Sequence, residues 1–268
     1  MWTFTVKKAF EFGFKSIFVF ELRGQGYSQK VWPNSDALGA NHVQFFADYG
    51  RDLVTFLQIV GKQNRSNVKG SYLLAQSTGA LVVASALERI KIEVPDLYPK
   101  RIVFWSPLFR IKLSRLVDNF VVRTGLSFVD SVALRLQKLI LVSHVRNLPF
   151  AGNRLTHDPA KLDAYNHFRF NQKLGSIGIS LRWVLEAMRA SHKFLRSGYK
   201  TIDVNTLIFE SECDEIVDHS IRPQNSYFVY KVASGARHSL NIEANSIFEP
   251  IVQESLEYLK SELQSSNV

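Results

Sequence analysis

Three polar side chains have the types, and the order along the chain, that acyl transfer requires. Ser77 lies in the pentapeptide AQSTG at positions 75–79, and Asp214 and His238 follow it. A serine hydroxyl is a weak nucleophile until a base accepts its proton, and histidine is a base that works near neutral pH. A carboxylate beside the imidazole would hold its tautomer and stabilise the imidazolium. These residues therefore predict a Ser-His-Asp site that hydrolyses its substrate through an acyl-enzyme.

Ser77 stands between a predicted strand and a predicted helix. Residues 68–74, which end in an apolar run, precede it as a predicted short strand, and the small and apolar residues 79–87 follow it. A serine on such a turn is a nucleophile elbow, in which the tight backbone lifts Oγ above the edge of the sheet. Ala75 replaces the first glycine of the usual pattern, which the backbone tolerates if its φ and ψ are allowed. Without its partners, the pentapeptide is equally compatible with an ordinary surface serine.

Both partner residues follow predicted strands in the order that the elbow fold requires. Residues 206–210 lead into an acidic loop that holds Asp214 and Asp218, and residues 227–232 lead into His238. The carboxyl ends of strands are where open α/β sheets build their sites. We favour Asp214 as the acid because it follows its strand more closely. Asp218 stays a competing candidate, with a solvated or helix-capping role as the alternative.

The other histidines and the single cysteine are expected to have no catalytic role. None of the remaining histidines stands in a small-residue loop after a terminal strand, so we interpret them as surface or packing residues: His42, His144, His157, His167, His192 and His219. Cys213 lies next to the predicted acid, but no Cys or His pattern surrounds it. A lone cysteine excludes an internal disulfide and suits a reducing compartment.

Further motifs extend the pattern over nearly the whole chain, and together they resemble the serine-nucleophile α/β-hydrolases. Within these, the chain is most similar to the lysophospholipase L2 and monoacylglycerol lipase-like branch. Residues 20–28 (FELRGQGYS) are similar to the D-x-R-G-x-G-x-S turn of that branch, and residues 41–53 and 235–238 also match. The departures are Glu21 for Asp, Gln25 for His and Ala75 for Gly.

The resemblance implies a function. Ser77, Asp214 and His238 fall on the nucleophile, the acid and the base of the family, and none of the departures touches them. The expected substrate is a small-molecule lipid ester, either a lysophospholipid or a monoacylglycerol, and no cofactor or metal is expected. Another carboxylesterase or an aminopeptidase-like peptidase is an alternative. A second alternative is a non-catalytic protein that keeps the three residues as a relic.

The remaining periodicity predicts an α/β fold with a mainly parallel sheet and helices on both faces. Apolar runs predict strands at residues 16–20 and 101–105, and amphipathic patterns predict helices at 46–60 and 244–263. The final residues, 265–268, are polar and are expected to fray.

Between residues 108 and 199 the rhythm changes, which predicts a mainly helical insertion in a core of residues 1–107 and 200–268. In the resembling family this position holds a lid or cap, so the resemblance implies that the insertion is a lid. We expect helices at 116–141 and 177–195, joined by a loop that contains Pro149, Gly152 and Pro159. Apolar lid residues could contact a lipid chain or pack on the core: Leu113, Leu116, Phe120, Val121, Leu126 and Phe128. A basic cluster could meet a phosphate or form a solvated face: Arg110, Lys112 and Arg115.

In the resembling family, three strands and a loop precede the segment with which this chain starts. That loop donates one oxyanion-hole N–H, and the residue after the nucleophile, here Thr78, donates the other. Loss of one donor costs about 100- to 1,000-fold in rate. We therefore expect a fold whose first strands are missing, with weak activity and marginal stability that an N-terminal extension would restore.

Composition limits the possible partners. The net charge of +9 could favour an anionic membrane surface, or it could simply aid solubility. Charges interrupt every apolar run before it reaches the length of a membrane-spanning helix, and the N-terminus lacks the pattern of a signal peptide. No nucleic-acid-binding motif is present. We therefore expect a cytoplasmic protein, with peripheral membrane contact as an option.

Overall fold

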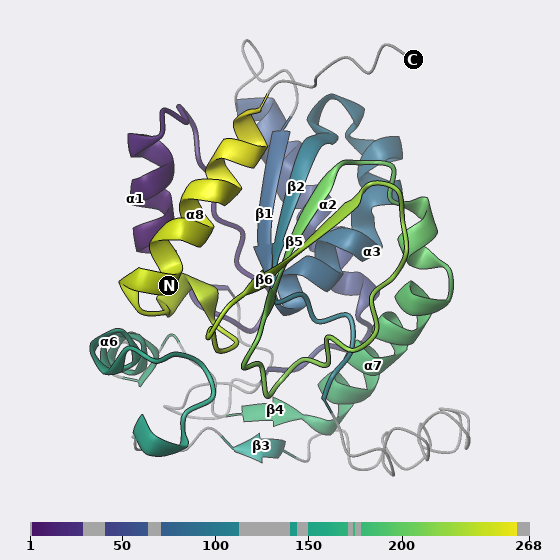
Figure 1. Cartoon of the computed structure of the whole chain (residues 1–268). Coiled ribbons are helices and arrows are strands. Elements are labelled where there is room, and N and C mark those ends of the chain that lie inside the picture. The colour runs from purple at the N-terminus through teal and green to yellow at the C-terminus, as the bar shows by residue number, and fades with distance from the viewer. Residues whose placement is uncertain are drawn as a thin grey trace.

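The computed structural model describes residues 2–28, 41–63, 71–112, 140–143, 150–170, 174 and 178–261. Within them, four strands form one sheet in the order β1-β2-β5-β6, and every neighbouring pair is parallel. The strands are β1 (Ser71–Gln76), β2 (Pro99–Trp105), β5 (Thr206–Ser211) and β6 (Phe228–Ala233) (Figure 1). Because all four run the same way, their carboxyl ends meet at one edge of the sheet.

Helices cover both faces of this sheet (Figure 1). One face carries α1 (Thr3–Glu11) and α8 (Asn245–Lys260), and the other carries α2 (Ala47–Gln63), α3 (Thr78–Glu93) and α7 (Leu181–Arg196). Alternate residues of β2 show how the core divides. Val103 and Trp105 pack towards α8, whereas Ile102 and Phe104 belong to the cluster that includes α2 and α3. The predicted α/β class with helices on both faces is confirmed.

The strand predicted at residues 16–20 is wrong, because the structure has irregular backbone there. Phe18 and Val19 are 44% and 47% exposed, so the apolar run is not buried as a strand interior would be. Nearby Phe14 makes a ring-to-ring contact with Tyr72 of β1, at 6.0 Å between centroids. A strand needs a ladder partner, and among the described residues the outer edge of β1 pairs with none.

The predicted insertion is only partly described. Residues 116–139 of the helix predicted at 116–141 lie outside the described residues, and its last two residues belong instead to β3 (Ile140–Ser143). β3 pairs antiparallel with β4 (Gly178–Ser180), so the helix predicted at 177–195 starts as a strand and continues as α7. The predicted loop contains the helix α6 (Pro159–Phe170), whose first residue is a proline, a residue favoured at that position.

Helix α7 packs directly on the core. The Ser180 hydroxyl caps its start by accepting a hydrogen bond from the Trp183 N–H at 3.2 Å. Trp183 Nε1 donates to the Tyr49 hydroxyl on α2 at 3.0 Å, and Phe194 packs on Phe109 with 4.4 Å between ring centroids. The boundaries of the insertion at 108 and 199 stay a prediction.

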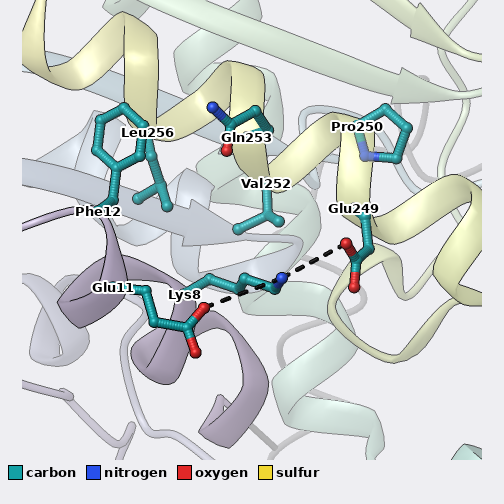
Figure 2. A pocket seen from close by; sticks show the side chains of 8 residues that line it. All are labelled: Lys8, Glu11, Phe12, Glu249, Pro250, Val252, Gln253 and Leu256. Atoms are coloured by element: carbon teal, nitrogen blue, oxygen red, sulfur yellow. Dashed lines mark hydrogen bonds and ion pairs between the residues drawn. The ribbon is translucent and has the colours of Figure 1, made fainter.

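A shallow pocket of about 430 Å³ separates α1 from α8 (Figure 2). Its charged side chains pair with each other, since Lys8 Nζ lies 3.4 Å from Glu249 and 4.0 Å from Glu11. None of the predicted catalytic residues lines it. The pocket therefore belongs to the packing of α1 on α8.

Trp105 is expected to be a main support of the fold. Its side chain is fully buried, stacks on Trp2 at 5.8 Å between centroids, and donates Nε1–H to the Ser255 hydroxyl at 2.9 Å. Replacing Trp105 by Ala should lower the free energy of unfolding by about 3–5 kcal/mol because of the cavity it creates. Equilibrium urea unfolding measures this loss. Ile92→Ala, at a position 74% exposed, is the control and should change it by less than about 0.5 kcal/mol.

Candidate active site

Ser77 sits on the turn between β1 and α3 in a strained backbone conformation. Its φ is +53° and its ψ is −121°, a region that non-glycine residues rarely adopt. The neighbouring strand holds this turn, because the Ser77 N–H donates to the Trp105 carbonyl at 2.9 Å. The Ser77 carbonyl in turn accepts from the Ala80 and Leu108 N–H groups, both at 3.1 Å. This is the strand-turn-helix geometry of the predicted elbow.

The small residues around the elbow leave room for Ala75. Ala75 lies inside β1 and has no positive φ, so its side chain adds no backbone strain. A Cβ placed on Gly79 would lie 3.8 Å from the Ala75 Cβ, which is ordinary van der Waals contact. Alanine in place of the usual glycine is therefore accommodated.

His238 lies between the other two predicted residues. Its Nε2 is 2.8 Å from Ser77 Oγ, and its Nδ1 is 2.8 Å from Asp214 Oδ2. The residues His238 and Asp214 are each 5% exposed. Gln76, the residue before the serine, also donates its side-chain N–H to the His238 carbonyl at 3.1 Å. The three sequence-predicted residues thus form one hydrogen-bonded chain.

Asp214 and Asp218, the two candidate acids, have different surroundings. Asp214 Oδ1 accepts the N–H groups of Ile216 at 2.8 Å and Val217 at 2.9 Å, which turns Oδ2 towards His238. Asp218 instead accepts from the Ser220 N–H at 2.9 Å and lies 3.6 Å from Arg110 Nε. Of these two carboxylates, the structure brings Asp214 against the imidazole.

The Asp214 carboxylate is held ionised. Burial alone would raise its pKa, but hydrogen bonds from His219 and His238 and from the Val217 N–H lower that pKa well below its ordinary value. An ionised carboxylate can only accept, so His238 Nδ1 carries the proton. In the neutral imidazole Nε2 is then an acceptor for the Ser77 hydroxyl. This is the tautomer that a general base for Ser77 needs.

Sequence analysis missed the role of His219, interpreted as a surface or packing residue. Its Nε2 lies 3.2 Å from Asp214 Oδ2, the same oxygen that His238 contacts, and its side chain is 16% exposed. The spacing of five residues between the two side chains on one loop was the only available signal. Cys213, by contrast, is exposed and takes no part in these contacts.

Glu243, a second buried carboxylate, was also missed, and it fixes the loop that carries His238. Its side chain is fully buried and accepts hydrogen bonds from the backbone N–H groups of His157 at 2.9 Å and Arg237 at 2.7 Å. The Thr156 hydroxyl lies 3.3 Å from the same carboxylate. The residue before His238 is therefore bonded to a segment about 80 positions earlier in the chain.

Other predicted residues lie around this centre. Thr78 is the first residue of α3, where helical geometry leaves N–H groups without an intrahelical acceptor. Lys112 of the basic cluster donates to the Asp214 carbonyl at 2.9 Å, and Arg110 faces Asp218, so neither is simply solvated. Arg115 and the six apolar lid residues lie outside the described residues.

The family-like segments at 20–28 and 41–53 meet each other in the structure. Arg23 Nε donates to Asp52 Oδ2 at 2.6 Å, and its Nη1 lies 3.5 Å from Asp48. Glu21, which replaces the usual Asp, accepts the Tyr27 N–H at 2.7 Å and so closes the turn. These contacts brace the turn against the start of α2.

Comparison with known proteins gives one family and many solved structures. Residues 6–245 match the family model described as Hydrolase_4, serine aminopeptidase S33. A monoacylglycerol lipase of Paleococcus ferrophilus shares 14% identity, with 96% of this chain and 88% of that chain covered and a TM-score of 0.65. A soluble variant of the monoglyceride lipase of Saccharomyces cerevisiae, solved with a substrate analog, shares 16% identity over 90% and 75% of the two chains, with a TM-score of 0.64.

An esterase of Exiguobacterium antarcticum shares 15% identity over 97% of this chain and 87% of that chain, with a TM-score of 0.57. At these identities the likeness shows the fold. A comparison with curated proteins gave no match. In the part of the chain that the structure describes, no helix is long and apolar enough to cross a membrane. Within that same part, no group of three or more His, Cys, Asp or Glu side chains is arranged to hold a metal ion.

The stability of the fold should depend on pH through Glu243. Burial alone would raise the pKa of Glu243, but N–H donors from His157, Arg237 and Ala244 lower that pKa below its ordinary value of 4.5. A folded pKa below the unfolded one contributes stability above the unfolded value, and this is lost as the pH falls through the folded value. The free energy of unfolding should therefore decline below about pH 4.5.

Urea unfolding at several pH values tests this for the Glu243→Gln variant. At pH 7 the variant should be less stable by about 2–3 kcal/mol, because an amide cannot accept from all the donors. Its decline with acid should also be shallower than that of the parent. Glu11→Gln, on an exposed side chain, is the control and should keep the slope of the parent. A Glu243→Gln variant with an unchanged slope would contradict the assignment.

Proposed function

The chain belongs to the serine aminopeptidase S33 family of α/β-hydrolases, and from this membership we propose that it is a serine hydrolase that cleaves carboxylic esters of lipids. The observation that carries the proposal is the position of His238. One ring nitrogen lies 2.8 Å from Ser77 Oγ, and the other lies 2.8 Å from Asp214 Oδ2. Nucleophile, base and acid are thus in mutual hydrogen-bond reach, as a Ser-His-Asp mechanism requires.

The proposed reaction proceeds in two steps. Ser77 Oγ attacks the ester carbonyl carbon while its proton passes to His238 Nε2, and Asp214 stabilises the resulting imidazolium. The C–O bond to the alcohol then breaks, and the alcohol leaves with the proton from His238. Water attacks the acyl-enzyme with His238 again as the base. This releases the fatty acid and restores the Ser77 hydroxyl.

The tetrahedral intermediate carries a negative oxygen that needs preorganised donors. We assign the Thr78 N–H as one of them, because it follows the nucleophile and opens helix α3. The positive end of the helix dipole would add to this stabilisation. Ser77 itself caps the start of α3, so the first turn of the helix follows the nucleophile directly.

The substrate class rests on similarity. The similar Paleococcus structure is that of a monoacylglycerol lipase, the Saccharomyces structure is that of a monoglyceride lipase, and an esterase has the same fold. We propose a monoacylglycerol or a lysophospholipid as the substrate, and the net charge of +9 suits contact with an anionic lipid surface. The family description favours a second candidate, the hydrolysis of an aminoacyl amide.

Ser77→Ala should abolish hydrolysis by removing the nucleophile. Turnover of p-nitrophenyl esters of short and long acyl chains, of monoacylglycerol and of lysophospholipid measures the ester reaction, and aminoacyl p-nitroanilides measure the peptidase alternative. A fluorophosphonate probe, which labels an activated serine, should react with the parent and not with the variant. Ser220→Ala, on the exposed part of the acid loop, is the matched serine control. A parent that neither turns over any substrate nor takes the probe would support a non-catalytic role.

Asp214→Asn should lower kcat far more than Asp218→Asn. The amide would favour the wrong tautomer of His238, which costs about 10⁴-fold in the known Ser-His-Asp case. Asp218 faces Ser220 and Arg110, so its loss should cost less than about tenfold. Ester turnover by both variants, with thermal melts to check folding, gives the ranking. The reverse order would move the acid role to Asp218.

A further inference from the structure

The Asp214 carboxylate is shared by two imidazoles. Its Oδ2 lies 2.8 Å from His238 Nδ1 and 3.2 Å from His219 Nε2, while its Oδ1 is occupied by two backbone N–H groups. The ionised carboxylate accepts only, so His219 must present Nε2–H to it. The proposed Ser-His-Asp mechanism uses one of these imidazoles and leaves the other unexplained.

Besides contacting the Asp214 carboxylate, His219 borders a pocket on the acid loop. It lines an open pocket of about 260 Å³, and Ser77 and His238 are not among the residues that line this pocket. The charged groups that line it come from three parts of the chain: Lys112, Glu210, Glu212, Asp214, Asp218 and Arg222. His219 therefore links this open pocket to the buried carboxylate of Asp214.

Most of the other charged groups around His219 are engaged elsewhere. Glu210 lies 2.6 Å from Arg222, and Asp218 lies 3.6 Å from Arg110. Lys112 donates to the backbone carbonyl of Asp214 at 2.9 Å, and Glu212 accepts the Gly235 N–H at 2.7 Å. Asp214 is thus the carboxylate with which His219 is hydrogen-bonded.

A second donor on Oδ2 changes what Asp214 does for His238. Each N–H donated to this oxygen stabilises the negative charge of the carboxylate. The carboxylate then stabilises a protonated His238 less strongly. When His219 takes up a second proton and becomes an imidazolium, its positive charge repels a protonated His238. This repulsion also makes protonation of His238 less favourable. The donor also limits rotation of the carboxylate, which keeps Oδ2 aligned with His238.

We propose that His219 is a positioning residue, which aligns the Asp214 carboxylate and sets how strongly it holds a proton on His238. The inference rests on the proposed function, because it concerns the base of that reaction. It adds a fourth residue to the hydrogen-bonded chain, and this residue is in contact with solvent. The chain then runs from the open pocket to Ser77 through His219, Asp214 and His238.

Imidazole ¹⁵N spectra of the full-length protein, recorded across a pH titration, test the proposal without any need for activity. In His219→Phe, the midpoint of proton uptake by His238 should rise by about 0.5–1 pH unit, because Asp214 then serves His238 alone. His219→Gln keeps an N–H donor and should lie closer to the parent. His192→Gln, on α7, is the matched control and should leave the midpoint unchanged.

The outcomes separate this inference from the proposed function. A His238 midpoint that is the same in His219→Phe and the parent, or shifts equally in the Phe and Gln variants, would overturn the role of His219. Thermal melts verify folding, and His219→Ala replaces the Phe variant if the ring does not fit. Fluorophosphonate labelling across pH should show the same shift. Absence of labelling in the parent would refute the hydrolase and leave the imidazole titration as the test of His219.

Discussion

The ionised carboxylate of Asp214 is the interaction on which the site depends. A charge at 5% exposure is costly unless donors replace the lost water, and here each carboxylate oxygen faces two N–H groups. Two of them are backbone groups of the same loop, so the turn after β5 folds around its own acid. The other two are imidazoles. His219 belongs to the same loop, and His238 ties that loop to the end of β6. A fold that leaves this carboxylate charged also settles which nitrogen of His238 carries the proton.

The strain at Ser77 is the second constraint, and the sheet supplies what holds it. A residue with a φ of +53° persists only where its surroundings fix it, and the bond from its N–H to the Trp105 carbonyl comes from the neighbouring strand. The same Trp105 is buried against Trp2, just before α1, and against Phe248 of α8. Core packing on one face of the sheet and the geometry of the turn at its edge are therefore coupled through β2. A loss of packing at Trp105 would therefore disturb the backbone geometry of the turn at Ser77.

Sequence reasoning succeeded where a local pattern carries the information. Apolar runs ended by polar loops indicated β2, β5 and β6, and small residues after Ser77 indicated a buried helix. It failed at residues 16–20, because hydrophobicity does not say whether a ladder partner is present. It missed α6 because Pro159 was interpreted as a loop residue, although proline suits a first helical position. Glu243 and His219 were missed for another reason. Their partners are side chains and N–H groups that only the tertiary fold brings near, and a single sequence carries no record of such contacts.

Two buried carboxylates, Asp214 and Glu243, flank His238, and they divide the work of placing it. Glu243 binds the backbone of the preceding residue and links the loop to residues 156–157, so it fixes where the loop lies. Asp214 binds the imidazole itself and fixes its rotation and tautomer. The position of the loop and the orientation of the ring are thus fixed by two different carboxylates. The acid loop, the histidine loop and the segment before α6 must therefore close together. His238 is correctly oriented only when these three segments are packed together. The alignment of the base therefore depends on all the loops at the carboxyl edge of the sheet.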